Sequence, residues 1–243
     1  FDYARTPAQI AWSYNRGAPL AWYKFDECSG ANINNSMGNG LNGALELGAS
    51  GTTSAGNCTT SGAWYNGAAG KYGVSMAFDG SDDYVQVTDT ANLRFDSNTQ
   101  DYSIFTWVKR SLSNTTEYLI SKEDADNDGW RLLINSDNTV TCSINSIDIT
   151  SSATILASKW YHIGCVVDRD GNGQIYINGN PSGSATAISS ETMATTSNIR
   201  IGTRSYTSTN YFAGQIDNLQ IYNYALNPVQ IKQIMNSGAV NFQ

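Results

Sequence analysis

The stretch Met-Ala-Phe-Asp-Gly-Ser-Asp-Asp-Tyr-Val, residues 76–85, points most directly to the fold of this chain. At its centre, the pair Asp79-Gly80 is of the kind that supplies the positive φ required by a tight turn. The flanking runs 74–78 and 84–88 are short and rich in β-forming residues, which is typical of strands. The stretch therefore predicts two strands joined by a hairpin turn.

The same pattern of short β-rich runs separated by turn residues continues along the chain. Further strands are predicted at 20–26, 102–110, 118–122, 130–135, 139–144, 160–168, 174–178, 199–203 and 212–222. Turn signals lie between them at 39–40, 136–138, 170–173 and 178–179. Because no helices are interleaved, the pattern predicts an all-β fold of two packed antiparallel sheets rather than a parallel α/β fold.

Composition narrows the function classes. A chain of 243 residues can form one β-sandwich domain, and only 14% of its residues are charged. The 14 basic residues are scattered, so a nucleic-acid-binding surface is not expected. The sequence contains no apolar run long enough to predict a membrane-spanning segment. We expect any export signal to have been removed or to lie upstream of this sequence. The net charge of −7 reflects many aspartates in predicted turns. These aspartates either bind Ca²⁺ or are present simply because Asp favours turn conformations.

The four cysteines, Cys28, Cys58, Cys142 and Cys165, form no C-x-x-C pair, and a single histidine leaves little for a zinc site. In an exported protein they predict two disulfides, for which three pairings exist. We favour Cys28–Cys58, which would tie a long early loop, and Cys142–Cys165, which would join two strands.

Two segments predict helices, and they resemble each other. Residues 1–10 and 222–231 both contain an aromatic-Asx-Tyr-Ala sequence, then a capping residue (Thr6 or Asn227), a proline and a Gln-Ile pair. A capping oxygen followed by proline is a sound way to begin a helix. We therefore interpret residues 1–16 as the tail helix of a preceding similar repeat or a linker, and residues 17–243 as one domain. Coincidence between two helix starts is the alternative.

Four blocks in order resemble the laminin-G-like domains of the concanavalin A-like jelly-roll superfamily, above all those of bacterial surface proteins. The blocks are residues 20–27 with 39–43, residues 76–85, residues 160–163 with 174–179, and residues 212–219 with 221–222. The resemblance covers about residues 17–236 and implies a two-sheet antiparallel jelly-roll β-sandwich with a short C-terminal helix. It also implies an extracellular or cell-surface module.

The same resemblance implies a structural Ca²⁺ where the first and last strands meet. It places Asp26 and Asp217 there, with Asn42 and the carbonyls near Gly30 and Gly43 as companions. Ca²⁺ takes six to eight oxygen ligands, which suits carboxylates and carbonyls of a Gly/Asn loop. The alternative is that both carboxylates accept backbone hydrogen bonds at the strand ends.

A second candidate Ca²⁺ site is Asp124-x-Asp126-x-Asp128-Gly129, which copies the opening of an EF-hand loop. Its closing glutamate is missing, because the twelfth position is Asn135. The segment is therefore either a different surface Ca²⁺ loop or a solvated hairpin tip.

The sequence does not favour catalysis. The only histidine, His162, lies on a predicted strand beside aromatic residues, so we interpret it as framework. No serine lies in a G-x-S-x-G elbow, and no glutamate has the carboxylate neighbour on a strand that glycosidases of the concanavalin-type fold use. An enzyme, in particular a glycoside hydrolase, is therefore the least favoured of three hypotheses.

The first hypothesis is a Ca²⁺-stabilised adhesion or binding module that recognises a glycan through exposed aromatic and polar side chains. The second is a structural repeat whose partner is a surface protein or the neighbouring tandem repeats. Candidate ligand-binding residues lie in loops or next to them: Trp64, Trp130, Arg131, Tyr206, Asn210 and Tyr211. The sequence does not identify the ligand.

Overall fold

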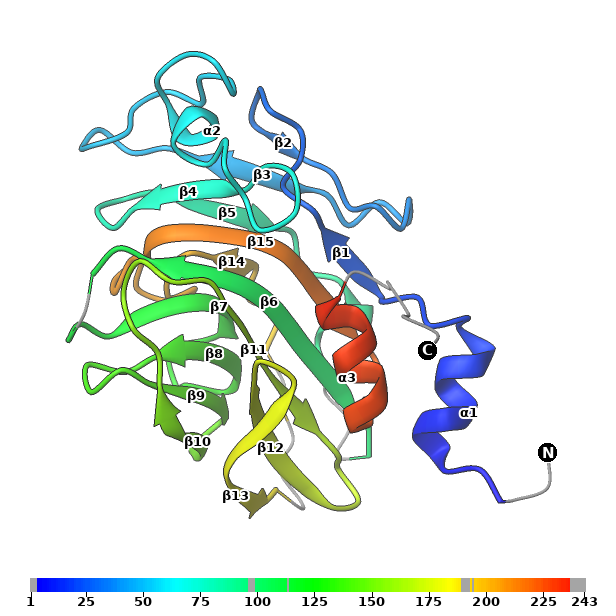
Figure 1. Cartoon of the computed structure of the whole chain (residues 1–243). Coiled ribbons are helices and arrows are strands. Elements are labelled where there is room, and N and C mark those ends of the chain that lie inside the picture. The colour runs from blue at the N-terminus through cyan, green and yellow to red at the C-terminus, as the bar shows by residue number, and fades with distance from the viewer. Residues whose placement is uncertain (1–3, 96–98, 113, 189–192, 194, 237–243) are drawn as a thin grey trace.

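The computed structural model describes residues 4–95, 99–112, 114–188, 193 and 195–236. The chain forms two antiparallel sheets, shown in Figure 1, with short helices outside them. The helices are α1 (Pro7–Tyr14), α2 (Ala63–Asn66), the 3-10 turn η1 (Ala91–Leu93) and α3 (Pro228–Met235). The strands are β1 (Ala21–Tyr23), β2 (Asn32–Ile33), β3 (Gly43–Glu46), β4 (Met76–Asp79), β5 (Tyr84–Val87), β6 (Tyr102–Arg110), β7 (Glu117–Glu123), β8 (Gly129–Ile134), β9 (Thr139–Ile144), β10 (Ile147–Thr154), β11 (Tyr161–Val167), β12 (Asn172–Ile177), β13 (Asn180–Ala187), β14 (Ile199–Ile201) and β15 (Ala213–Tyr222).

The two sheets form the predicted β-sandwich. One sheet has the order β1-β15-β6-β11-β12-β13, with β4 also paired to β15, and the other has the order β10-β9-β8-β7-β14-β5-β3-β2. The first and last strands pair, since Ala21 lies opposite Ile221. This arrangement confirms the all-β, two-sheet antiparallel jelly roll with a C-terminal helix.

The Asp79-Gly80 turn differs from the hairpin predicted for it. Gly80 does have a positive φ of 82°, but β4 and β5 do not pair with each other. Instead, β4 pairs with β15 in one sheet, and β5 lies between β14 and β3 in the other. The turn is therefore a corner at which the chain crosses between sheets, and residues 79–83 close it.

The predicted disulfide pairings are both present. Cys28 and Cys58 have Cα atoms 5.2 Å apart, and Cys142 and Cys165 have Cα atoms 6.3 Å apart. Both separations suit a disulfide. Because Cys142 is on β9 and Cys165 is on β11, the second bond joins the two sheets through the core.

A second, smaller apolar cluster lies outside the main core, where α1 and α3 stand side by side (Figure 1). It contains Tyr222 and Ile231, and the ring of Trp12 in α1 stacks on Tyr222 with centroids 6.5 Å apart. Both helices begin with the same capping box, Thr6 with Gln9 in α1 and Asn227 with Gln230 in α3. Among the described residues, no helix is long and apolar enough to cross a membrane.

Candidate functional site

A buried glutamate organises two arginines on the outer face of the eight-stranded sheet. Side chains alternate along β7 and β8, so Leu132 faces the core while Arg131 faces outward. The carboxylate of Glu123, which is completely buried, accepts a hydrogen bond from Arg131 Nη1 at 2.9 Å and another from Arg204 Nε. The arginine side chains remain 13% and 24% exposed. The two cations are therefore fixed in place and still reach solvent.

The loop 204–211 is attached to β7 beside this glutamate. The Ser205 amide donates to Ser121 Oγ at 2.6 Å, and the Ser205 hydroxyl both accepts from the Glu123 amide and donates to its carbonyl. The guanidinium of Arg204 lies 5.8 Å from the ring of Tyr118. These bonds hold the loop in which Tyr206, two residues after Arg204, is 52% exposed and presents its ring to solvent.

We name Tyr118, Glu123, Arg131, Arg204 and Tyr206 the Glu123 cluster. An open groove of about 710 Å³ begins beside it, between β10 and β13. Asp148 connects the two, since it lines the groove and its carboxylate lies 4.0 Å from Arg131 Nη2. The remainder of the groove is lined mainly by hydroxyl side chains: Thr150, Ser151, Ser152, Ser184 and Thr186. Such a surface can donate and accept many hydrogen bonds with a polar ligand.

Sequence reasoning anticipated part of this cluster. Arg131 and Arg204, which lies two positions before Tyr206, come from separate segments and meet at Glu123. Asn210 is exposed, but its amide donates to the Thr116 carbonyl at 3.3 Å, and Tyr211 is half-buried. Glu123 was missed as a site residue. Regular alternation along β7 would place Tyr118 and Glu123, five residues apart, on opposite faces, and a β-bulge between Tyr118 and Ile120 brings them to the same face.

Two of the predicted ligand-binding residues need correction. Trp64 and Trp130 are completely buried, so neither ring presents a face to a ligand. Trp64 donates from Nε1 to the Gly30 carbonyl at 2.9 Å, beneath the loop tied by the first disulfide. Trp130 packs in the main core and donates from Nε1 to the Leu93 carbonyl at 3.2 Å. Large aromatic area explains both positions, because it stabilises most when buried.

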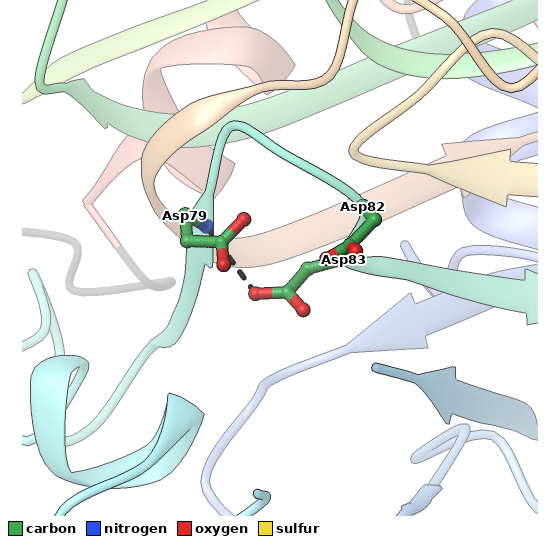
Figure 2. Close-up of side chains that lie close together, drawn as sticks. All are labelled: Asp79, Asp82 and Asp83. Carbon is green, nitrogen blue, oxygen red and sulfur yellow. Dashed lines mark hydrogen bonds between the residues drawn. The ribbon is translucent and has the colours of Figure 1, made fainter. Parts of the chain in front are cut away.

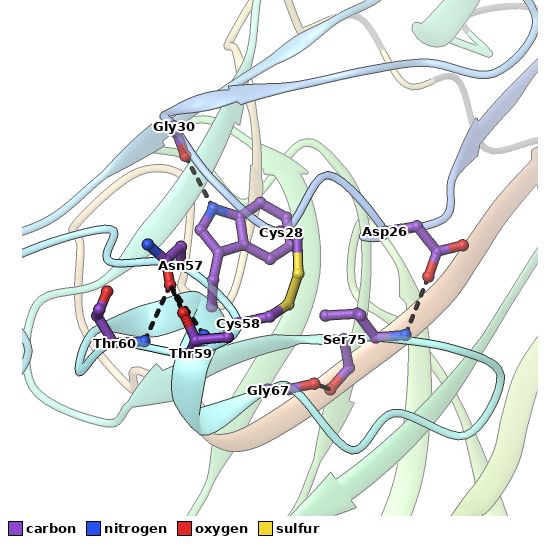
Figure 3. The surroundings of a disulfide bond; sticks show 11 residues. Asp26, Cys28, Gly30, Asn57, Cys58, Thr59, Thr60, Gly67 and Ser75 are labelled. Carbon is purple, nitrogen blue, oxygen red and sulfur yellow. Dashed lines mark hydrogen bonds between the residues drawn. A yellow bond between two sulfur atoms is a disulfide. The ribbon is translucent and has the colours of Figure 1, made fainter.

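The residues predicted to hold Ca²⁺ at the strand junction are partly assembled. Asp217 is completely buried and accepts from the amides of Lys71 and Tyr72 at 2.7 and 2.8 Å. Asp26, shown in Figure 3 beside the first disulfide, accepts from the Val74 amide at 3.0 Å. Burial, together with the nearby charge of Asp26, raises the pKa of Asp217 to about 7.

Asp26 and Asp217 thus both accept backbone hydrogen bonds, which is the alternative to Ca²⁺ binding that the sequence left open. Asn42 uses its side-chain oxygen elsewhere, accepting from the Asn35 amide at 2.9 Å. A Ca²⁺ ion at this junction remains a prediction.

The Asp124 loop is a turn between β7 and β8. One oxygen of Asp124 accepts from the amides of Asp126 and Asp128, both at 3.1 Å. This is the hydrogen-bond pattern of an Asx turn, in which the aspartate stabilises its own loop. Ca²⁺ binding at Asp124, Asp126 and Asp128 remains a prediction.

A third group of carboxylates was overlooked because its sequence was interpreted only as a turn. Asp79, Asp82 and Asp83 lie together at the corner between β4 and β5 (Figure 2). Each offers an oxygen within 4.8 Å of those of the other two, and among the described residues this is the one such acidic group found. Burial, followed by the charge of Asp79, raises the pKa of Asp83 to about 7.

Comparisons with known proteins agree with the fold. The sequence profile of the concanavalin A-like lectin/glucanases superfamily, laminin G type 3, matches residues 79–232. No curated protein shows a significant sequence match.

Solved structures extend the agreement. Domain 4 of AbnA, a GH43 extracellular arabinanase from Geobacillus stearothermophilus solved in complex with arabinotriose, is 21% identical with a TM-score of 0.66. The match covers 90% of this chain and 98% of that domain. The binding domain of Paraclostridial Mosquitocidal Protein 1 is 19% identical with a TM-score of 0.68, over 90% of this chain and 52% of that one.

A structure of botulinum neurotoxin type C is 14% identical to this chain, with a TM-score of 0.64. Cell entry of that toxin depends on interaction with two ganglioside molecules. That match covers 94% of this chain and 53% of the toxin chain. The chain thus spans about half the length of both toxin structures. At these identities, the three structures establish a shared fold.

Proposed function

Because the chain belongs to the concanavalin A-like lectin/glucanases superfamily, we propose that it is a non-catalytic, glycan-binding module of an extracellular or cell-surface protein. The observation that carries the proposal is the Glu123 cluster. One buried glutamate fixes two arginines; the exposed Tyr206 lies near Arg204, and a hydroxyl-lined groove begins beside Arg131. Aromatic rings pack on sugar rings, while charged and hydroxyl groups bind the sugar hydroxyls. The arabinotriose complex and the ganglioside-dependent toxin support a glycan as the ligand class.

The absence of catalysis is part of the proposal. A glycosidase needs one carboxyl group that protonates the leaving oxygen and a second that attacks or activates water. The buried glutamates Glu117 and Glu123 each form ion pairs with arginine instead, Glu117 with Arg110 at 2.6 Å. Both carboxylates are buried and engaged by arginine, so neither is free to contact a glycosidic bond, which supports a binding role.

We expect Tyr206→Ala to weaken glycan binding about tenfold, because a lost stacking contact is worth about 1 kcal/mol or more. The measurement is a glycan array that includes arabinan oligosaccharides and ganglioside glycans, followed by calorimetric titration of the strongest hit. The matched control is Tyr65→Ala, which removes another half-exposed tyrosine, outside the cluster. Equal affinity of both variants would place the ligand elsewhere. No binding across the array would favour a protein partner, and turnover of any glycan would overturn the non-catalytic proposal.

A second role, as one repeat of a tandem array, is favoured by α1. Ile231 of α3 is completely buried in the outer apolar cluster, whereas Ile10, its counterpart in the repeated sequence, is 56% exposed. We propose that residues 1–16 are the last helix of a preceding, similar domain, whose own strands would cover Ile10. Trp12, stacked on Tyr222, would then form part of the joint between repeats.

If α1 belongs to a neighbouring domain, the two isoleucines respond very differently to truncation. We expect Ile231→Ala to lower the free energy of unfolding by about 2–4 kcal/mol. Ile10→Ala is expected to change it by no more than about 0.5 kcal/mol, because its side chain is exposed. Urea denaturation measures both. A large loss for Ile10→Ala would make α1 an integral part of this domain.

A further inference from the structure

The corner between β4 and β5 brings three carboxylates to one point where the sheets meet. One oxygen each of Asp79, Asp82 and Asp83 lies within 4.8 Å of the other two. Ca²⁺ binds oxygen at about 2.4 Å, so two ligands of one ion are at most about 4.8 Å apart. The three carboxylates therefore have a spacing that one ion can span.

Backbone amides hold two of the carboxylates in position. Asp79 accepts from the amides of Ser81 at 2.8 Å and Thr52 at 2.6 Å, and Asp82 accepts from the Ser50 amide at 2.9 Å. These amides belong to the corner itself and to the loop that follows β3. The carboxylates are thus oriented by the fold rather than by one another.

The burial of Asp83 is a second observation, independent of the spacing of the three carboxylates, that indicates a bound cation. Its side chain is 1% exposed, and one oxygen accepts from the Asp79 amide at 3.3 Å. Its other oxygen, Oδ1, is buried and, like Asp82 Oδ1, makes no well-formed hydrogen bond among the described residues. The backbone amide of Gly48 lies close enough to the Asp83 carboxylate to favour its charged form. Figure 2 shows the hydrogen-bonded oxygen of Asp83 directed toward the Asp79 amide. None of the ion pairs within the described ranges involves this group.

We propose that Asp79, Asp82 and Asp83 bind one Ca²⁺ ion that fastens the crossing between the sheets. A buried carboxylate is costly unless a cation or hydrogen bonds compensate its charge. Ca²⁺ would bind the buried Oδ1 oxygens of Asp82 and Asp83 and neutralise their mutual repulsion. Mg²⁺ fits less well, because it demands shorter, strictly octahedral coordination and gives up its waters reluctantly. The site shares no residue with the Glu123 cluster, so it can fail or hold independently of glycan binding.

The test is a calorimetric titration of the chelator-treated protein with CaCl₂, with the melting temperature measured in Ca²⁺ and in EDTA. Ca²⁺ sites of extracellular modules have Kd values of about 10⁻⁴–10⁻³ M, so the titration should extend to about 10 mM. We expect one bound ion per chain and a higher melting temperature in Ca²⁺. Asp83→Asn should weaken Ca²⁺ binding at least about tenfold and remove most of the Ca²⁺-dependent rise.

Matched aspartate-to-asparagine variants distinguish this corner from the two sites predicted from sequence. Asp26→Asn and Asp124→Asn should each keep the affinity of the unaltered protein. If Asp83→Asn does not fold, Asp82→Asn tests the same site from a half-buried position. The proposal is overturned if the unaltered protein binds no Ca²⁺, or if the corner variants keep its affinity. It is also overturned if Asp26→Asn or Asp124→Asn alone abolishes binding.

Discussion

Replacing Glu117 with glutamine is expected to lower the free energy of unfolding by about 3–5 kcal/mol, because it leaves a buried arginine without its counter-charge. The side chains of Arg110 and Glu117 are 0% and 1% exposed, and their charged atoms lie 2.6 Å apart. Arg110 ends β6 in one sheet and Glu117 begins β7 in the other. The pair therefore links the two sheets at a crossing of the chain. Urea denaturation at neutral pH measures the loss.

The opposite truncation gives a matched comparison. Burial raises the pKa of Glu117, so in Arg110→Met the remaining carboxyl can take up a proton and become neutral. Arginine cannot lose its charge, so Glu117→Gln should destabilise more than Arg110→Met. The double variant should recover part of the loss, since it removes both charges. A loss below about 1 kcal/mol for Glu117→Gln would contradict this interpretation of the pair.

Most strands could be predicted because the residues that face the core alternate with polar ones. The prediction for β9 matches the observed bounds for that reason, since Val140, Cys142 and Ile144 alternate with Thr and Ser. The bounds of β6 also match, although Phe105 and Trp107 make its other face apolar as well. By contrast, β10 and β13 were missed, because Ser, Thr and Ala dominate them and much of their length is exposed. These strands lie at the ends of their sheets, where a strand buries little and a polar sequence suffices.

The candidate site was harder to predict, because its residues act through contacts between distant segments. Arg131 and Arg204 meet at Glu123, and nothing local in the sequence marks Glu123 as their shared partner. Burial was also misjudged for Trp64 and Trp130, since tryptophan is common both in cores and in sugar-binding loops. The carboxylates of Asp82 and Asp83 converge only because Asp79-Gly80 turns a corner between sheets. A turn signal does not reveal whether the strands that it joins will pair.

The second large effect concerns acid stability and depends on His162. This side chain is 3% exposed and lies between the rings of Phe105 and Trp107, with both centroid distances 5.3 Å. Its Nδ1 has no hydrogen-bond partner within the part of the chain that the structure describes. Burial lowers the pKa of His162 to about 3, so the folded protein holds the imidazole neutral. The prediction that His162 is a framework residue fits this surrounding.

We expect His162 to destabilise the fold increasingly as the pH falls from about 6.5, its pKa when unfolded, toward 3. In that window the unfolded chain binds a proton that the folded chain does not, at about 1.4 kcal/mol per pH unit. The contribution should reach about 3 kcal/mol near pH 4.5 and vanish above about pH 7. The raised pKa values of Asp83 and Asp217 act in the opposite direction, so the difference from His162→Phe isolates the histidine. Since it is the only histidine, one imidazole NMR signal reports it, and a folded-state pKa near 6.5 would refute the prediction.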